Sequence, residues 1–292
     1  METFAIKRPP IIHCKIDNLD DQEFYIKDFV EKLEGKHLDY FYNNLKTLKV
    51  KITDKLKLNF AGAEYDIYAN IINCPHSEIR RNIMHELFHV ATRVKNGELI
   101  HTGFMIIYTD KRGIGIGLNE GYTCLMDERY FPDYDINKLK DKNVIYKMTK
   151  YICHYLDLLV GKDYMEHLFM HADLAGLYDI LSDYSNDTRA YNFLIDLDRL
   201  YLEADIKKIP NIPKVFEIFD NIKFFLAECF VTRFRYQLRD GELTQEEFDQ
   251  VNTIVNHLLD DTINYFKIIR SKKYSKYRYM IDEIVDQKIS RG

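Results

Sequence analysis

The segment HELFH at residues 85–89 carries two imidazoles and a carboxylate in a spacing that suits metal-dependent hydrolysis. Positions four apart on an α-helix differ by about 40° around the axis, so His85 and His89 project from one face and can bind one cation. Glu86 lies about 100° from His85, which leaves its carboxylate outside the pair but close to a metal-bound water. This arrangement is typical of zinc sites in which the glutamate is the general base. We therefore predict that His85 and His89 bind Zn2+ and that Glu86 is catalytic.

The residues around this segment predict a buried helix from Ser77 to Val94. Pro75 and Ser77 are suited to its start, and Asn96-Gly97 is suited to a left-handed cap at its end. Apolar residues occupy most of its circumference, as expected of a helix inside a domain: Ile79, Ile83, Met84, Leu87, Phe88, Val90, Ala91 and Val94. Because short motifs also arise by chance, the alternative is two core histidines bonded to backbone carbonyls.

A catalytic zinc takes three protein ligands and keeps a fourth position for water, so a third ligand is needed. The metzincin pattern would place glycine and histidine where this chain has Thr92 and Lys95, which excludes that family. The stretch GLNEGYTCLMDE, residues 117–128, places Glu120 at the start of a run with helical spacing, after a glycine-punctuated segment. We assign Glu120 as the third ligand. His101, twelve residues past His89, is the alternative.

These motifs resemble those of the gluzincins, zinc peptidases in which HExxH is joined by a glutamate from a second helix carrying an NE motif, as in the thermolysin-like and minigluzincin groups. A strand followed by HELFHVAT, a hairpin and LNEGYT is similar to a group of uncharacterised bacterial gluzincin-like proteins. The resemblance covers roughly residues 50–130, and more loosely the helices after them. It implies a zincin-like fold, a peptide or protein substrate, zinc bound by His85, His89 and Glu120, a water polarised by Glu86, and Asn119 beside the glutamate.

The chain departs from the gluzincin pattern in two places. The interval between His89 and Glu120 is longer than the thermolysin-like spacing, although GFMIIYTDKRGIGIG in between is typical of a hairpin that fills the gap. Four residues after the glutamate, where such families often carry an acid that orients a histidine ligand, the chain has Cys124. A ligating imidazole needs an acceptor for its second N–H. Asp127 is our candidate for that role, and a solvated surface carboxylate is its alternative.

The oxyanion that develops during hydrolysis needs a hydrogen-bond donor from the far wall of the cleft. The candidates, each of which is also typical of a packing or surface residue, are His101, Tyr108, Tyr122, His154 and Tyr191. His76, just before the predicted helix, is more typical of a cap or surface residue than of a ligand.

Composition indicates an ordinary soluble protein: 292 residues, 46% hydrophobic, 30% charged, with a net charge of −5. No nucleic-acid partner is predicted, because the basic run 270–278 is typical of a solvated helix face in an acidic chain. No secretory or membrane-spanning segment is apparent, so we expect no membrane partner. Five cysteines without a CxxC motif favour free thiols, hence the cytoplasm. The oligomeric state is left open.

The order of elements predicts an α+β fold. A helical stripe covers residues 21–47, and three short strands follow at 48–52, 56–60 and 65–72, forming a small, mostly antiparallel sheet over the buried zinc helix. In gluzincins an edge strand pairs with the substrate backbone, and we expect Tyr65–Ile72 to do so. Asn70 and Asn73 are candidates for polar contacts there, or for turns.

Beyond residue 133 the pattern becomes long helical runs, which predicts a zincin subdomain at 1–132 and a helical subdomain at 133–292 that forms the other cleft wall. The predicted helices are 143–159, 164–181, 188–204, 215–239 and, with interruptions, 245–289. Three functions are compatible with the sequence: a zinc peptidase, a zinc-binding but catalytically quiet regulator or scaffold, and a toxin-like enzyme or small-molecule hydrolase. An intact Glu86 favours the peptidase.

Overall fold

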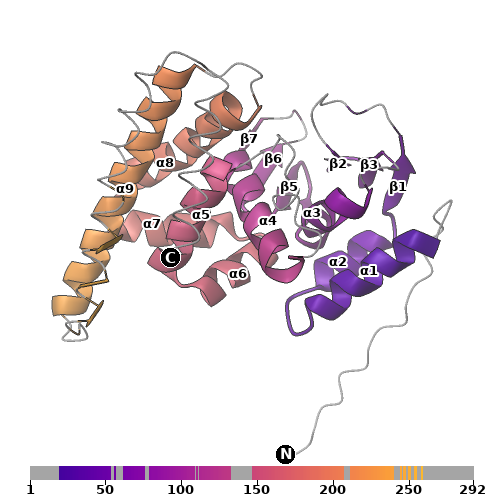
Figure 1. The fold of residues 1–292 in the computed structure, drawn as a ribbon, viewed down its shortest axis with the longest axis horizontal. Coiled ribbons are helices and arrows are strands. Elements are labelled where there is room, and N and C mark those ends of the chain that lie inside the picture. The colour runs from indigo at the N-terminus through magenta and orange to yellow at the C-terminus, as the bar shows by residue number, and fades with distance from the viewer. Residues whose placement is uncertain are drawn as a thin grey trace, which may run out of the picture.

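The fold is α+β, with two small sheets followed by a bundle of helices (Figure 1). The computed structural model describes residues 20–53, 56, 62–75, 79–108, 110, 112–132, 147–206, 211–239 and several positions from 244 to 258. Within these ranges the N-terminal helices are α1 (Asp20–Lys32) and α2 (Asp39–Leu45). The single helical stripe predicted for 21–47 therefore divides, and Gly35 has a positive φ of 87° in the turn between the two helices.

The first sheet has the strand order β1-β3-β2, formed by β1 (Lys49–Ile52), β3 (Ile71–Cys74) and β2 (Glu64–Asp66). β1 is parallel to β3 and β2 is antiparallel to it, so this sheet is mixed. The prediction of one strand over Tyr65–Ile72 is wrong, because a turn separates β2 from β3. The Asp66 carboxylate accepts hydrogen bonds from the N–H groups of Tyr68 and Ala69, and Asn70 has a φ of 56°. The strand predicted at 56–60 lies almost entirely outside the described residues.

The second sheet is an antiparallel meander of β4 (Val94–Asn96), β5 (Leu99–Thr102), β6 (Met105–Tyr108) and β7 (Gly113–Ile114). The predicted hairpin between the two motifs is confirmed by the β6–β7 pairing. The helix that carries HELFH, α3 (Ile79–Ala91), ends earlier than predicted, because Val94 already pairs with His101 in this sheet. Asn96-Gly97 therefore forms the β4–β5 connection and does not cap the helix.

The helices after the sheets are α4 (Ile116–Tyr130), α5 (Lys147–Val160), α6 (Lys162–Met170), α7 (Leu174–Tyr184), α8 (Asp187–Leu200), a π-helix (Tyr201–Ile206) and α9 (Ile212–Arg239). The run predicted at 164–181 is broken, since Ala172 has a φ of 54° and the Asp173 carboxylate caps α7 at Gly176. The runs predicted at 143–159, 188–204 and 215–239 correspond to α5, α8 with the π-helix, and α9. Most of 245–289 lies outside the described residues.

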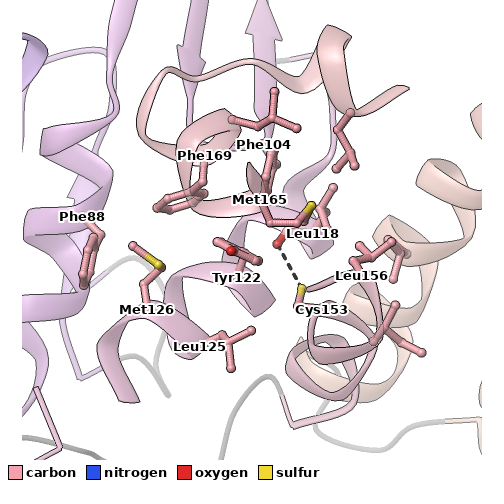
Figure 2. Close-up of a cluster of buried hydrophobic side chains, with 14 of the residues drawn as sticks. Phe88, Phe104, Leu118, Tyr122, Leu125, Met126, Cys153, Leu156, Met165 and Phe169 are labelled. Carbon is pink, nitrogen blue, oxygen red and sulfur yellow. Dashed lines mark hydrogen bonds between the residues drawn. The ribbon is translucent and has the colours of Figure 1, made fainter. Parts of the chain in front are cut away.

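A cluster of buried hydrophobic side chains packs the motif helices α3 and α4 against α5 and α6 (Figure 2). The fully buried ring of Tyr122 packs against both Phe104 and Phe169, with ring centroids 5.1 Å from each. On α3, Phe88 contacts Phe169 and also the Phe29 ring of α1. One hydrophobic core thus extends on both sides of the predicted boundary at 132, and it fixes α3 relative to α4.

Candidate metal centre

The side chains of His85, His89 and Glu120 converge on one point between α3 and α4, and we call these three residues the ligand group. The two Nε2 atoms are 3.2 Å apart, Nε2 of His85 is 3.3 Å from Oε2 of Glu120, and Nε2 of His89 is 3.6 Å from its Oε1. A tetrahedral zinc with bonds of about 2.0–2.1 Å requires its ligand atoms to be roughly 3.3 Å apart. The donor atoms and their separations therefore fit a tetrahedral ion such as Zn2+.

α3 is held in place at its C-terminal end by a pair of buried threonines. The Thr92 hydroxyl donates to the carbonyl of Phe88 and contacts the Thr102 hydroxyl at 3.0 Å. Thr102, on β5, in turn donates to the carbonyl of His89 at 3.0 Å. These bonds satisfy carbonyl groups at the helix end and fix the backbone of a ligand against the second sheet. Sequence reasoning did not identify either threonine.

α4 is positioned by glycines and by a carboxylate from α8. Gly115 begins the helix with a φ of 86°, a conformation that favours glycine. The Asp198 side chain accepts hydrogen bonds from the N–H groups of Gly115 and Gly117, at 2.9 and 2.8 Å. This caps the helix start from another part of the chain. Next to the ligand, a Cβ atom on Gly121 would lie 2.6 Å from the carbonyl carbon of Thr149, so the absence of a side chain lets α5 approach α4 closely.

Each ligand histidine has a partner on α4 for its second ring nitrogen. Nδ1 of His89 is 3.2 Å from Nδ2 of Asn119, whose Oδ1 accepts the N–H of Phe104 at 3.1 Å. Which amide atom of Asn119 faces Nδ1 depends on the tautomer of His89. Binding a metal through Nε2 requires the proton on Nδ1 and the amide oxygen turned toward it. Nδ1 of His85 is 3.8 Å from Sγ of Cys124.

The electrostatics of the ligand group suit a cation. Burial lowers the pKa of His89 to about 4, which keeps that imidazole neutral and its lone pair available. Burial also lowers the pKa of His85, but the Cys124 side chain and the carboxylates of Glu120 and Glu86 raise it, and the net pKa lies well above the ordinary value. Without a metal, His85 thus carries a proton that a metal ion would displace.

Glu86 lies beside the ligand group and is 7% exposed. Burial and, more weakly, the charge of Glu120 raise the pKa of Glu86, whereas the neighbouring His85 and the backbone N–H of Tyr65 lower it, and the net pKa is about 7. Tyr65 stacks parallel to the His89 ring at 6.5 Å, and its hydroxyl donates to Oδ1 of Asn70 at 2.6 Å. The turn role considered for Asn70 is confirmed by its φ of 56°, and its amide oxygen also makes a polar contact that orients an aromatic ring next to the site.

The alternatives for the metal ligands have different positions in the structure. His101 does not belong to the ligand group, and strand alternation places it on the face of β5 opposite to Thr102, which contacts α3. Asp127 is 5% exposed, so the alternative of a solvated surface carboxylate is wrong. Nδ1 of His85 contacts Sγ of Cys124, at the position where an acid was expected. His76 lies outside the described residues.

The proposed oxyanion donors also differ in environment. Tyr122 is unsuited to the role, because it is fully buried and its hydroxyl donates to Oδ1 of Asp157 at 2.9 Å. Tyr108 and Tyr191 are about half exposed, on β6 and α8. His154 is partly buried on α5, where burial lowers its pKa. The oxyanion donor stays unassigned.

No protein-family model, no curated protein and no solved structure matches this chain. The resemblance to gluzincins therefore stays a prediction carried by the motifs. Among the described residues, no helix is both long and apolar enough to cross a membrane.

Proposed function

We propose that this protein is a zinc-dependent peptidase with a zincin-like, gluzincin-type site. The observation that carries the proposal is the convergence of His85, His89 and Glu120, whose donor atoms lie 3.2–3.6 Å apart, close to the edges of a tetrahedral zinc site. Two sequence motifs on separate helices supply these atoms, and Glu86 lies next to them.

In this proposal the two imidazoles and the Glu120 carboxylate hold Zn2+, which when bound supplies a Lewis acid that activates water and polarises the substrate carbonyl. Glu86 accepts the proton of the attacking water and passes it to the leaving amine. Its burial supports this role, because a carboxylate removed from bulk solvent is a stronger base than an exposed one. The aromatic ring of Tyr65 lies parallel to the His89 ring, with the ring centroids 6.5 Å apart.

The proposed substrate is a peptide or protein that binds in an extended conformation. Among the strands that the structure describes, β2 (Glu64–Asp66) lies at one edge of the first sheet. The backbone of its Tyr65 bonds to Glu86, and its ring lies parallel to that of His89. A peptide pairing with this edge would be held by main-chain hydrogen bonds, which grip the backbone without selecting side chains.

The described cysteines Cys74, Cys124, Cys153 and Cys229 are buried free thiols, which supports a reducing compartment and hence the cytoplasm.

Replacement of Glu86 by Gln tests the proposal. Peptide hydrolysis is measured by mass spectrometry on a mixed peptide library, and zinc per chain is measured by elemental analysis. We expect wild type to bind one zinc and to hydrolyse peptides, and Glu86→Gln to keep the zinc but to lose at least about 100-fold in rate, because a general base contributes roughly 10²–10⁴-fold.

Glu98→Gln, in the exposed β4–β5 turn, is the matched control and should keep full activity. If wild type holds zinc yet cleaves nothing in the library, the peptidase proposal fails in favour of a zinc-binding regulator or scaffold. If wild type holds no zinc even after reconstitution, the metal centre itself is wrong.

A further inference from the structure

Cys124 lies one helical turn after Glu120 on α4, so the two side chains project from the same face of that helix. Its Sγ atom is 3.8 Å from Nδ1 of His85, within the range of a hydrogen bond to sulfur. The other ring nitrogen of His85, Nε2, faces the two other members of the ligand group. The His85 ring is therefore held between the metal position on one side and a sulfur atom on the other.

We propose that Cys124 is a positioning residue, and that its sulfur accepts the Nδ1–H of His85 and so orients that imidazole as a metal ligand. This inference rests on the proposed zinc site. It assigns to α4 two functions for one centre, since Glu120 provides a ligand and Cys124, four residues later, holds a ligand from α3. A metal bound at Nε2 leaves the imidazole proton on Nδ1, where it needs an acceptor.

The surroundings of Cys124 support a fixed role. The residue is 7% exposed, and the close approach of α5 at Gly121 prevents α4 from shifting away. The ammonium group of Lys150, which donates to Glu128 at 2.9 Å, is near enough to influence the thiol. Cys124 is thus enclosed by protein, so solvent cannot easily take its place beside His85.

Sulfur is a weaker hydrogen-bond acceptor than a carboxylate. The loss of such an outer partner typically weakens metal binding by about 10–100-fold. Removing the sulfur should therefore weaken zinc binding, and a carboxylate at the same position should restore it.

The test measures the dissociation constant of zinc by competition with a chromogenic chelator, for wild type and three variants at Cys124. Cys124→Ala removes the acceptor, Cys124→Val removes it while filling the space, and Cys124→Asp provides a stronger acceptor. We expect the first two to raise the Kd by about tenfold or more and Cys124→Asp to bind at least as tightly as wild type. Circular dichroism establishes that each variant is folded.

Cys153→Ala is the matched control. Cys153 is fully buried on α5 and its thiol donates to the carbonyl of Leu118 on α4, so it contacts the same helix without contacting a ligand. This variant should lose stability but keep the zinc Kd of wild type. It separates the cost of losing a buried thiol from the loss of an orienting contact.

A spectrum of the cobalt-substituted protein distinguishes an outer partner from a direct ligand. We expect no sulfur-to-cobalt charge-transfer band in wild type, and a band that disappears in Cys124→Ala would overturn the inference by making the sulfur a ligand. A zinc Kd within twofold of wild type in the Ala and Val variants would also overturn it, as would Cys124→Asp binding as weakly as Cys124→Ala. If wild type itself binds no zinc, the proposed function fails instead, and this inference with it.

Discussion

Helix α4 contributes to two buried polar clusters that compensate their carboxylates in different ways. Near its start, Glu120 meets the imidazoles of His85 and His89 in the ligand group. At its end, Arg129 belongs to a second set, which we call the ionic cluster and define as Lys36, Arg129, Asp157 and Glu166. The carboxylates pair with imidazoles in the first cluster and with permanent cations in the second.

The ionic cluster joins four parts of the chain. Glu166 on α6, 1% exposed, contacts Lys36 from the turn after α1, and accepts from Arg129 at 3.1 Å and from the Tyr130 hydroxyl at 2.7 Å. Burial raises the pKa of Glu166, but Lys36, Tyr130 and Arg129 lower it, and the net pKa is below its ordinary value. Arg129 also pairs with Asp157 on α5. These carboxylates are compensated by the protein itself.

The difference between imidazole partners and permanently charged partners indicates which cluster can bind a metal ion. A guanidinium or ammonium group has no lone pair to offer, so the ionic cluster is complete without any further ion. An imidazole gives up its proton in the neutral pH range and then presents a lone pair, so the ligand group can exchange a proton for a metal. We therefore expect metal to change the stability contributed by the ligand group and not that contributed by the ionic cluster.

The largest expected effect on folding comes from breaking the ionic cluster. Arg129→Ala leaves Asp157 and part of Glu166 uncompensated in the interior, which costs about 3–5 kcal/mol of unfolding free energy. Urea denaturation of the metal-free protein measures it. Arg112→Ala, which removes an exposed pair with Asp110, is the control and should change stability little. A comparable loss in both variants would contradict the structural role of the cluster.

The stabilisation of the protein by zinc is the next largest expected effect. With free zinc at roughly 100 times its Kd, wild type should gain about 2.7 kcal/mol of stability by mass action. Glu120→Ala removes one of three ligands and should lose that gain, whereas Arg129→Met should keep it despite a lower baseline. Thermal unfolding with and without zinc measures the zinc-dependent gain in stability of each variant. An equal zinc-dependent gain in Glu120→Ala would remove Glu120 from the ligand group.

The contrast between the clusters also explains what the sequence could reveal. His85 and His89 share one helix face with Glu86 beside it, and the local HExxH spacing is enough to identify all three residues. Glu120 required a second motif, and the structure brings it to the histidines as predicted. The ionic cluster has no such spacing, since Lys36 and Glu166 are separated by 130 residues and meet only because α6 packs beside the α1–α2 turn.

The same distinction holds for the fold. Long helices such as α9 could be predicted from periodicity, because each is set by its own residues. The end of α3 could not be predicted in this way, because Val94 fits a helical pattern but pairs with His101 in the second sheet. The turn within Tyr65–Ile72 depends on the Asp66 carboxylate and on Asn70, whose amide donates to the carbonyl of Asn44 in α2. Tertiary contacts thus decided the boundaries that local patterns missed.

Gly121→Ala should disturb both clusters through the helix that they share. Its Cβ would lie 2.6 Å from the carbonyl carbon of Thr149 and 2.9 Å from the backbone nitrogen of Lys150, so α4 and α5 must separate. Overpacking of this kind costs about 1–3 kcal/mol, which exceeds the gain of up to about 1 kcal/mol from alanine in a helix. Urea denaturation and the zinc Kd are the two measurements. Unchanged values for both would show that the contact between the helices is not tight.

The smallest expected effect concerns pH and the cap at the start of α4. Burial raises the pKa of Asp198 to about 6, although the N–H groups of Gly117 and Gly115 lower it. The same carboxyl titrates near about 3.9 in the unfolded chain. Because the folded pKa is the higher one, the stability from this group is fully present below about pH 4 and is lost as the pH rises through about 6.

Between about pH 5 and about pH 7.5, Asp198 should therefore cost the wild type about 1 kcal/mol of stability that an Asp198→Asn variant does not lose. Urea denaturation of both proteins at the two pH values measures the difference, which cancels titrations that they share. Asp196→Asn, two residues earlier on α8 and paired with Arg199 at 2.8 Å, is the matched control and should not reproduce the effect. If the wild type instead becomes more stable relative to Asp198→Asn as the pH rises, the hydrogen bonds from Gly115 and Gly117 outweigh the effect of burial on the carboxylate. The N-terminal end of α4 would then resemble the ionic cluster, with its charge compensated by the protein.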